Sequence, residues 1–274
     1  MGETIKTVVN LIKRIINDDV FDLSAQLAYY FLLSIFPLLI FVMTLLPYLP
    51  ISKDDLLGLV DGFAPGEIMD VIETNIDQIL SRNPSLLSFG IIATIWSASN
   101  GLNAIIKAFN KAYDVEETRS FLVARGMSVL LTLGMIAVVV VALLLPVFGE
   151  QIGMYLFSQL SLKEEFLTIW NTLRFLVSSI ILFIVFLALY WLAPNKKMKC
   201  ITAVPGAVFA AIGWIVASLG FSYYVGNFGN YSATYGSIGT IIVLMIWFYI
   251  TGIIIIIGGE INAYLSERKN QKCA

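Results

Sequence analysis

A run of 21 consecutive uncharged residues, from Gly239 to Gly259, constrains this chain more than any other feature of its sequence. At about 1.5 Å per residue, a helix of this length crosses a hydrocarbon core of roughly 30 Å. The rest of the sequence has the same character, since 58% of all residues are apolar and only 13% are charged. Soluble domains carry about a quarter charged residues, so the sequence predicts an all-α, polytopic membrane protein.

Apolar segments of membrane-spanning length recur along the chain, and we predict six transmembrane helices in one membrane domain, residues 1–274. The predicted spans cover about residues 23–49, 86–108, 126–147, 175–193, 202–224 and 238–260. Residues 1–22 alternate apolar and basic positions at helical spacing, which is typical of an interfacial amphipathic helix; packing on the underside of the bundle is the alternative. Residues 51–85 predict external amphipathic helices that cap the bundle between the first two spans.

The orientation of the chain follows from the short links between spans, because cytosolic links carry an excess of Lys and Arg. Most of the 17 Lys and Arg residues lie in the amino terminus, the second-to-third link, the fourth-to-fifth link and the carboxyl tail. We therefore expect both termini to be cytosolic. The start of the sequence lacks the pattern of a cleaved signal peptide, so the first span should act as the targeting signal.

Several polar residues lie near the expected cytosolic ends of the spans, and we predict that they line a polar cavity open to the cytosol. Leaving such groups unpaired in the membrane costs roughly 1 to 3 kcal/mol each, and more for an acid. The candidates are Gln26, Asn100, Asn103, Lys107, Glu260 and Asn262, with Asn100, Asn103 or Lys107 as the expected polar neighbours of Glu260. Gly258 and Gly259 remove side-chain bulk beside this acid, which should let another helix approach. The alternative is that the same groups form structural hydrogen bonds between helices.

Small residues at intervals of four predict close contacts between helices. The candidates are Ser97 and Gly101 in the second span, and Gly213 and Ala217 in the fifth. Pro37 removes a backbone donor within the first span and is a candidate hinge, although proline kinks are also ordinary in membrane helices.

The sequence also excludes several classes of function. It contains no histidine, which rules out a His-dependent metallohydrolase, and it shows no nucleophile beside a base. We therefore expect no enzyme activity, no catalytic residues, no metal site and no cofactor. With a net charge of −2 and no basic stripe, nucleic-acid binding is not expected. The expected partners are membrane lipids, and a homo-oligomer or an envelope protein partner stays open.

Three blocks of sequence carry a resemblance: LSAQLAYYFLLSIFPLL near the start, WSASNGLNAIIKAFNKAYDVEETRSFLVAR in the middle and YGSIGTIIVLMIWFYITGIIIIIGGEINA near the end. Together they resemble the BrkB/YihY family of bacterial inner-membrane proteins, once labelled ribonuclease BN. The resemblance implies a six-span protein of the bacterial plasma membrane, with lipid or amphiphile export suspected for some members, and it supplies no catalytic residues. The expected function is a transporter or lipid translocase; a non-transporting membrane scaffold or envelope-assembly partner is the alternative, and an intramembrane enzyme comes third.

Overall fold

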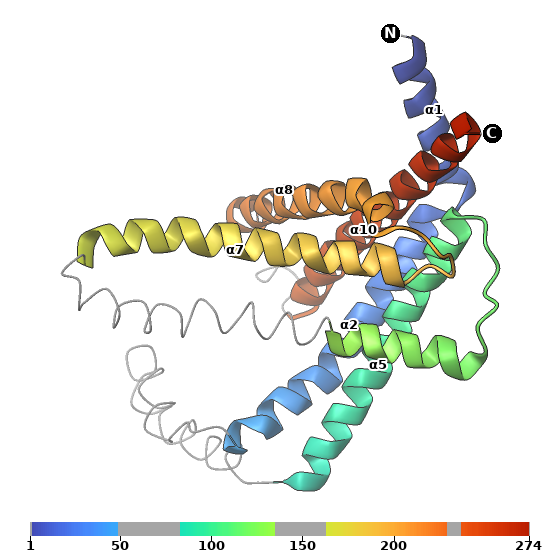
Figure 1. The fold of residues 1–274 in the computed structure, drawn as a ribbon. Helices are drawn as coiled ribbons and strands as arrows, with labels where there is room; N and C mark the ends of the chain where they lie inside the picture. The colour runs from blue at the N-terminus through green and yellow to red at the C-terminus, as the bar shows by residue number, and fades with distance from the viewer. Residues whose placement is uncertain (1, 49–82, 135–162, 229–236, 274) are drawn as a thin grey trace. The chain divides into compact units, whose positions relative to one another are not determined.

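The computed structural model describes residues 2–48, 83–134, 163–228 and 237–273 (Figure 1). Every regular element within these ranges is a helix, which confirms the all-α prediction for the described part of the chain. In chain order the elements are α1 (Gly2–Asn17), α2 (Val20–Leu45), the 3-10 helix η1 (Leu46–Tyr48), α5 (Pro84–Ala112), a helix described over Phe121–Gly134, α7 (Lys163–Leu192), the 3-10 helix η2 (Cys200–Ala203), α8 (Val204–Phe228) and α10 (Ser237–Cys273).

Four helical segments of the described chain are long and apolar enough to cross a membrane: Val20–Leu45, Pro84–Ala112, Cys200–Asn227 and Ile241–Arg268. The shorter apolar helices Phe121–Gly134 and Leu176–Leu192 overlap the third and fourth predicted spans. The third span would continue into residues 135–162, which lie outside the described residues, so the number of six stays a prediction. The predicted external cap also stays untested, because residues 51–82 lie outside the described part.

α10 and α7 extend well beyond the predicted spans. α10 continues through the polar segment after Asn262, where Glu267 accepts a hydrogen bond from Arg14 at 2.7 Å and Arg268 donates one to Thr7 at 3.3 Å. α7 begins at Lys163, so residues 163–169 are its first turns and not part of a separate external segment. No Gly or Pro interrupts the sequence of α7, and nothing in it ends the helix before the apolar part begins.

Aspartates in the left-handed conformation follow α1 and α5, with φ values of 54° at Asp19 and 50° at Asp114. After α5, the Val115 N–H donates to the Asn110 carbonyl at 2.9 Å and the Asp114 N–H to the Lys111 carbonyl at 3.0 Å. These two bonds form the Schellman pattern, in which carbonyls at a helix end find partners. Aspartate tolerates this conformation better than most residues, so each helix can stop without a glycine.

The helices fall into two compact units: one comprises Tyr30–Ala98, and the other Met1–Tyr29 together with Ser99–Ala274. In the smaller unit, α5 lies so close to α2 that a Cβ on Gly90 would come within 2.9 Å of the Phe41 Cα. In the larger unit, α8 packs against α7 and α10, and α1 packs against α10 (Figure 1).

Glycines make this close packing in the larger unit feasible. A Cβ on Gly206 of α8 would overlap the Gly258 carbonyl oxygen of α10, and a Cβ on Gly258 would overlap the Tyr190 hydroxyl of α7. A Cβ on Gly259 would lie 2.7 Å from the ring of Phe109 on α5. The expectation that Gly258 and Gly259 let other helices approach is therefore confirmed.

The four small residues predicted from their spacing are buried or half-buried. Ser97 and Gly101 are buried on α5, and Ala217 is half-buried on α8. A Cβ on Gly213 would lie 3.3 Å from the Ile254 side chain, which is a tight contact with a flexible neighbour. Gly206, which lies four positions before the buried Ala210 on the same helix, makes a closer approach to the backbone of α10.

Candidate functional site

A completely buried carboxylate, Glu260, lies on α10 directly after the charge-free run that ends at Gly259. Its Oε2 lies 3.2 Å from the Arg14 Nε of α1, and the two side chains form an ion pair. Its Oε1 is buried and has no hydrogen-bond partner among the residues that the structure describes. The Asp18 carboxylate, in the link between α1 and α2, is close enough to act on Glu260 by its charge. Glu260 thus combines full burial, one cationic partner and one unfilled acceptor.

Arg14 joins three helices at this point. Besides Glu260, its guanidinium binds Glu267 two turns further along α10, at 2.7 Å, and donates to the Ala112 carbonyl at the end of α5. Burial acts to lower the pKa of Arg14, but the hydrogen bond and charge of Glu267, with those of Glu260, more than offset it, so this pKa lies above its ordinary value. Arg14 therefore remains a cation and holds α1 against the bundle.

Tyr113 directly follows α5, on the same side as this ion pair. Burial, with a smaller effect from the negative charge of Glu260, raises the pKa of the Tyr113 hydroxyl well above its usual range. The Lys196 ammonium lies 5.0 Å from the centre of the Tyr113 ring, within the range of a cation-π contact. The surroundings of Glu260 therefore include a hydroxyl that stays protonated and a nearby second cation.

Asn262, two residues after Glu260, has both ends of its side chain satisfied. Its Oδ1 accepts from the Gly206 N–H at 2.7 Å, and its Nδ2 donates to the Ala203 carbonyl at 3.1 Å. Gly206 lies in the first turn of α8, where backbone N–H groups have no partner within the helix. Asn262 therefore caps α8 from α10, and the Tyr190 hydroxyl joins α7 to α10 in the same manner, by donating to the Ile255 carbonyl at 2.8 Å.

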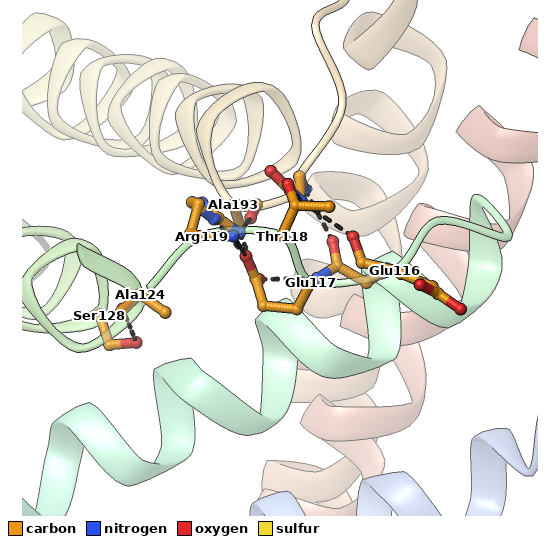
Figure 2. Close-up of polar contacts among 9 residues, drawn as sticks. Glu116, Glu117, Thr118, Arg119, Ala124, Ser128 and Ala193 are labelled. Atoms are coloured by element: carbon orange, nitrogen blue, oxygen red, sulfur yellow. Dashed lines mark hydrogen bonds and ion pairs between the residues drawn. The ribbon is translucent and has the colours of Figure 1, made fainter. Parts of the chain in front are cut away.

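A second polar cluster joins the link after α5 to the link after α7. Figure 2 shows Arg119 reaching both Glu117 and the Ala193 carbonyl. The guanidinium holds both oxygens of Glu117 at 2.7 Å, and this hydrogen bonding lowers the pKa of the Glu117 carboxyl. The contact with Ala193 is 3.1 Å and ties Arg119 to the end of α7.

Two asparagines complete this second cluster. Asn110 donates to Glu117 at 2.9 Å and accepts from the Asn195 backbone N–H at 2.7 Å. The Asn195 side chain in turn donates to the Glu116 carbonyl and to the Thr118 hydroxyl, each at 2.8 Å. Because these contacts join the two links to each other and to the end of α5, we interpret the cluster as a structural clamp.

The predicted cavity residues differ in their exposure, and the prediction that they line one cavity stays a prediction. Glu260 and Asn262 are buried, Asn103 is half-buried, and Gln26 and Lys107 are exposed. Asn100 accepts a hydrogen bond at 2.7 Å from Arg125, near the start of the next helix. The prediction that Lys107, Asn100 or Asn103 is the nearest polar neighbour of Glu260 is wrong, because Glu260 forms its ion pair with Arg14.

Sequence reasoning missed the roles of Arg14, Asp18, Asn110 and Glu117. From the sequence, Arg14 is only part of the positive charge of the amino terminus, although it lies seven positions after Thr7, which also contacts α10. Thr7 and Arg14 lie on the same face of α1, and this spacing could have indicated that the face contacts another helix. Pro37 lies within the continuous helix α2, in the smaller unit, and its role as a hinge stays a prediction.

Among the described residues, no group of three or more Cys, Asp or Glu side chains is placed to hold a metal ion. The polar contacts described above comprise one buried ion pair with an unfilled oxygen, interhelical hydrogen bonds, and the clamp between two links.

Comparisons with known proteins agree with this picture of a membrane protein. The sequence model of the family described as virulence factor BrkB matches residues 11–273. The chain is 57% identical over 247 residues to YfkH of Bacillus subtilis, whose name likens it to a ribonuclease; the match covers 90% of each chain. It is 30% identical over 278 residues to the UPF0761 membrane protein PBPRA3489 of Photobacterium profundum, covering 98% of this chain and 83% of that one.

A further relative, the UPF0761 membrane protein of Vibrio campbellii, is 29% identical over 268 residues, with coverage of 95% of this chain and 82% of its own. Of these three relatives, YfkH alone has a name that refers to an enzyme. No solved structure matches the chain.

Proposed function

Because the chain belongs to the virulence factor BrkB family, a family of membrane proteins and not a known enzyme family, we propose that it is a transporter that moves a lipid or another amphiphile across the plasma membrane. The observation that carries this proposal is the unfilled, buried Oε1 of Glu260. In this proposal, the Glu260 carboxylate is the charged group of a polar cavity that opens to the cytosol.

Glu260 differs from the polar residues near it on α10 and α7. The side chains of Asn262 and Tyr190 form hydrogen bonds with backbone groups of other helices and of the link before α8, so a structural role accounts for their burial. A buried acceptor without a partner costs roughly 1 to 3 kcal/mol, and more when it is charged. The ion pair of Oε2 with Arg14 does not remove this cost at Oε1, which favours a role of Oε1 in binding.

An amphiphile fits this setting because a charged point lies beside long apolar helix surfaces. The outward side of α8 is apolar along most of its length: Ile212, Val216, Leu219 and Tyr223 are all more than half exposed. These residues recur every three or four positions, as expected for one face of a helix in contact with lipid tails. The polar site would bind the headgroup of a lipid, and the apolar helix surfaces would contact its acyl chains.

The proposal includes a topology of six spans in the plasma membrane with both termini in the cytosol. It is supported by the basic residues of the links, such as Lys196, Lys197 and Lys199. Single cysteines at Lys197 and at Asp70, in a variant without the two natural cysteines, can be labelled on intact cells with an impermeant reagent. We expect labelling at Asp70 alone, and labelling at Lys197 alone would overturn the orientation.

Transport can be tested in vesicles of phosphatidylethanolamine and phosphatidylglycerol that contain the purified protein. A fluorescent phosphatidylglycerol in the inner leaflet should become accessible to an external quencher faster than in empty vesicles. Glu260→Gln should remove this acceleration, whereas Glu116→Gln, which changes an exposed carboxylate outside the site, should keep it. Equal rates in vesicles with and without protein would refute lipid translocation.

A non-transporting membrane scaffold is the second candidate, and the satisfied hydrogen bonds of Asn262, Tyr190 and the clamp around Glu117 favour it. In a scaffold, the ion pair of Glu260 would only fix α1 to α10. Glu260→Gln would then alter stability and leave no transport to lose, which the vesicle experiment distinguishes directly.

A further inference from the structure

The charges around Glu260 do not balance. Glu260 and Glu267 on α10 both contact the single guanidinium of Arg14, and Asp18 adds a third carboxylate that acts on Glu260. Glu267 is partly exposed, with 43% of its side chain accessible, so water can solvate it. Glu260 is completely buried, and one of its oxygens has no partner among the described residues. The negative excess therefore falls on the Oε1 of Glu260.

A missing positive charge at this oxygen can be a metal ion or a proton. A metal ion needs several oxygen ligands around it, and the described residues offer no group of three acidic side chains in such an arrangement. A proton needs only one oxygen. A buried carboxylate beside a second, partly exposed carboxylate favours the neutral, protonated state, because burial disfavours its charge and the two negative charges repel each other.

We propose that Glu260, with Asp18 beside it, is a proton-binding site, and that a proton is the ion coupled to transport. A proton from the aqueous phase adds to Oε1 and leaves a neutral carboxyl, whose O–H can donate to the Asp18 carboxylate. Arg14 then keeps its bonds to Glu267 and to the Ala112 carbonyl, so α1 stays attached while its pairing with Glu260 weakens. The coupling role rests on the proposed transport function, whereas the binding of a proton does not.

Charged and titratable groups on every neighbouring element bear on this site. They are Arg14 on α1, Asp18 in the link between α1 and α2, Glu267 on α10, Tyr113 directly after α5, and Lys196 in the link after α7, which lies over the Tyr113 ring. Tyr113 stays protonated across the physiological range, because its pKa is raised. Among these groups, Glu260 can take up a proton without leaving a buried cation unpaired, because Arg14 keeps Glu267 as its partner.

The binding of a proton can be read without any transport. Infrared difference spectra of the full chain in vesicles, recorded between neutral and acid pH, should contain the carbonyl band of a buried protonated carboxylic acid. This band should disappear in Glu260→Gln and shift in Glu260→Asp, and it should persist in Glu116→Gln, which alters an exposed carboxylate. If Glu260→Gln fails to fold, the shift in Glu260→Asp carries the assignment.

An unchanged band in both Glu260 variants, or its absence from the natural protein, would overturn the proton site. Loss of the band on addition of sodium at constant pH would show that sodium competes with the proton for this carboxylate, and would overturn the proton as the coupled ion. Coupling is tested separately with a pH-sensitive dye inside the vesicles: lipid movement should acidify or alkalise the interior in the natural protein. A protein that shows the band but moves neither lipid nor protons refutes the transport function and the coupling, and retains the proton site.

Discussion

Replacing Gly206 by alanine tests the packing that places the polar site. Gly206 lies in the first turn of α8, where its N–H donates to Asn262 and its Cα faces the backbone of α10. A methyl group there would overlap both the Gly258 carbonyl oxygen and the amide of Asn262. Because the first of these is backbone, the two helices must separate and Asn262 must leave its position.

The magnitude follows from three contributions. Overpacking costs about 1 to 3 kcal/mol. Loss of the two hydrogen bonds of Asn262 adds about 1 kcal/mol for each bond. The higher helix propensity of alanine offsets at most about 1 kcal/mol. We therefore expect Gly206→Ala to lower the free energy of unfolding by about 2 to 5 kcal/mol.

Unfolding by increasing SDS in mixed micelles, followed by tryptophan fluorescence, measures this change. Trp214 on α8 and Trp247 on α10 have ring centres 5.7 Å apart and report on the same pair of helices. Gly220→Ala is the matched control, since it lies on the same helix with nothing within 4 Å of the added Cβ. If both variants unfold at the same SDS concentration, the close approach of α8 and α10 at Gly206 is refuted.

Three further variants test the remaining contacts. Tyr190→Phe removes a buried hydrogen bond to the α10 backbone and should lower the unfolding free energy by about 1 kcal/mol, whereas the exposed Tyr223→Phe should not change it. Asp114→Gly should slow hydrogen exchange in the last turn of α5, and Asp114→Val should accelerate it, because φ is 50° there. The pKa of Glu117 is lowered in the folded protein, so Glu117 stabilises the fold above its unfolded pKa of about 4.3 and this contribution is lost as the pH falls. Thermal unfolding of Glu117→Gln in detergent should therefore change less on acidification than that of the natural protein; an equal change would contradict this assignment.

The sequence by itself determined that this is an all-α membrane protein, because the free energy of membrane insertion is a sum over about 20 successive residues. The charge-free run at Gly239 needs no knowledge of any neighbour to be recognised as a helix. The sequence also shows that Glu260 is unfavourable in such a helix, because the free-energy cost of a carboxylate in a membrane depends on its own position. Helix ends depend more on neighbours: α10 extends beyond its apolar part because α1 offers partners there.

Tertiary structure decided which groups meet. Arg14 and Glu260 are 246 positions apart, and no periodicity encodes which face of α1 turns toward α10. The sequence predicts Asn262 as a cavity residue, but in the structure it caps α8. Gly206 packs against Gly258, and this close contact brings the first turn of α8 within hydrogen-bonding distance of Asn262. The rotation of each helix also exposes Lys107 while it half-buries Asn103. Hydropathy specifies that a helix lies in the membrane, but its rotation and partners depend on side-chain shape, which acts only once the helices are in contact.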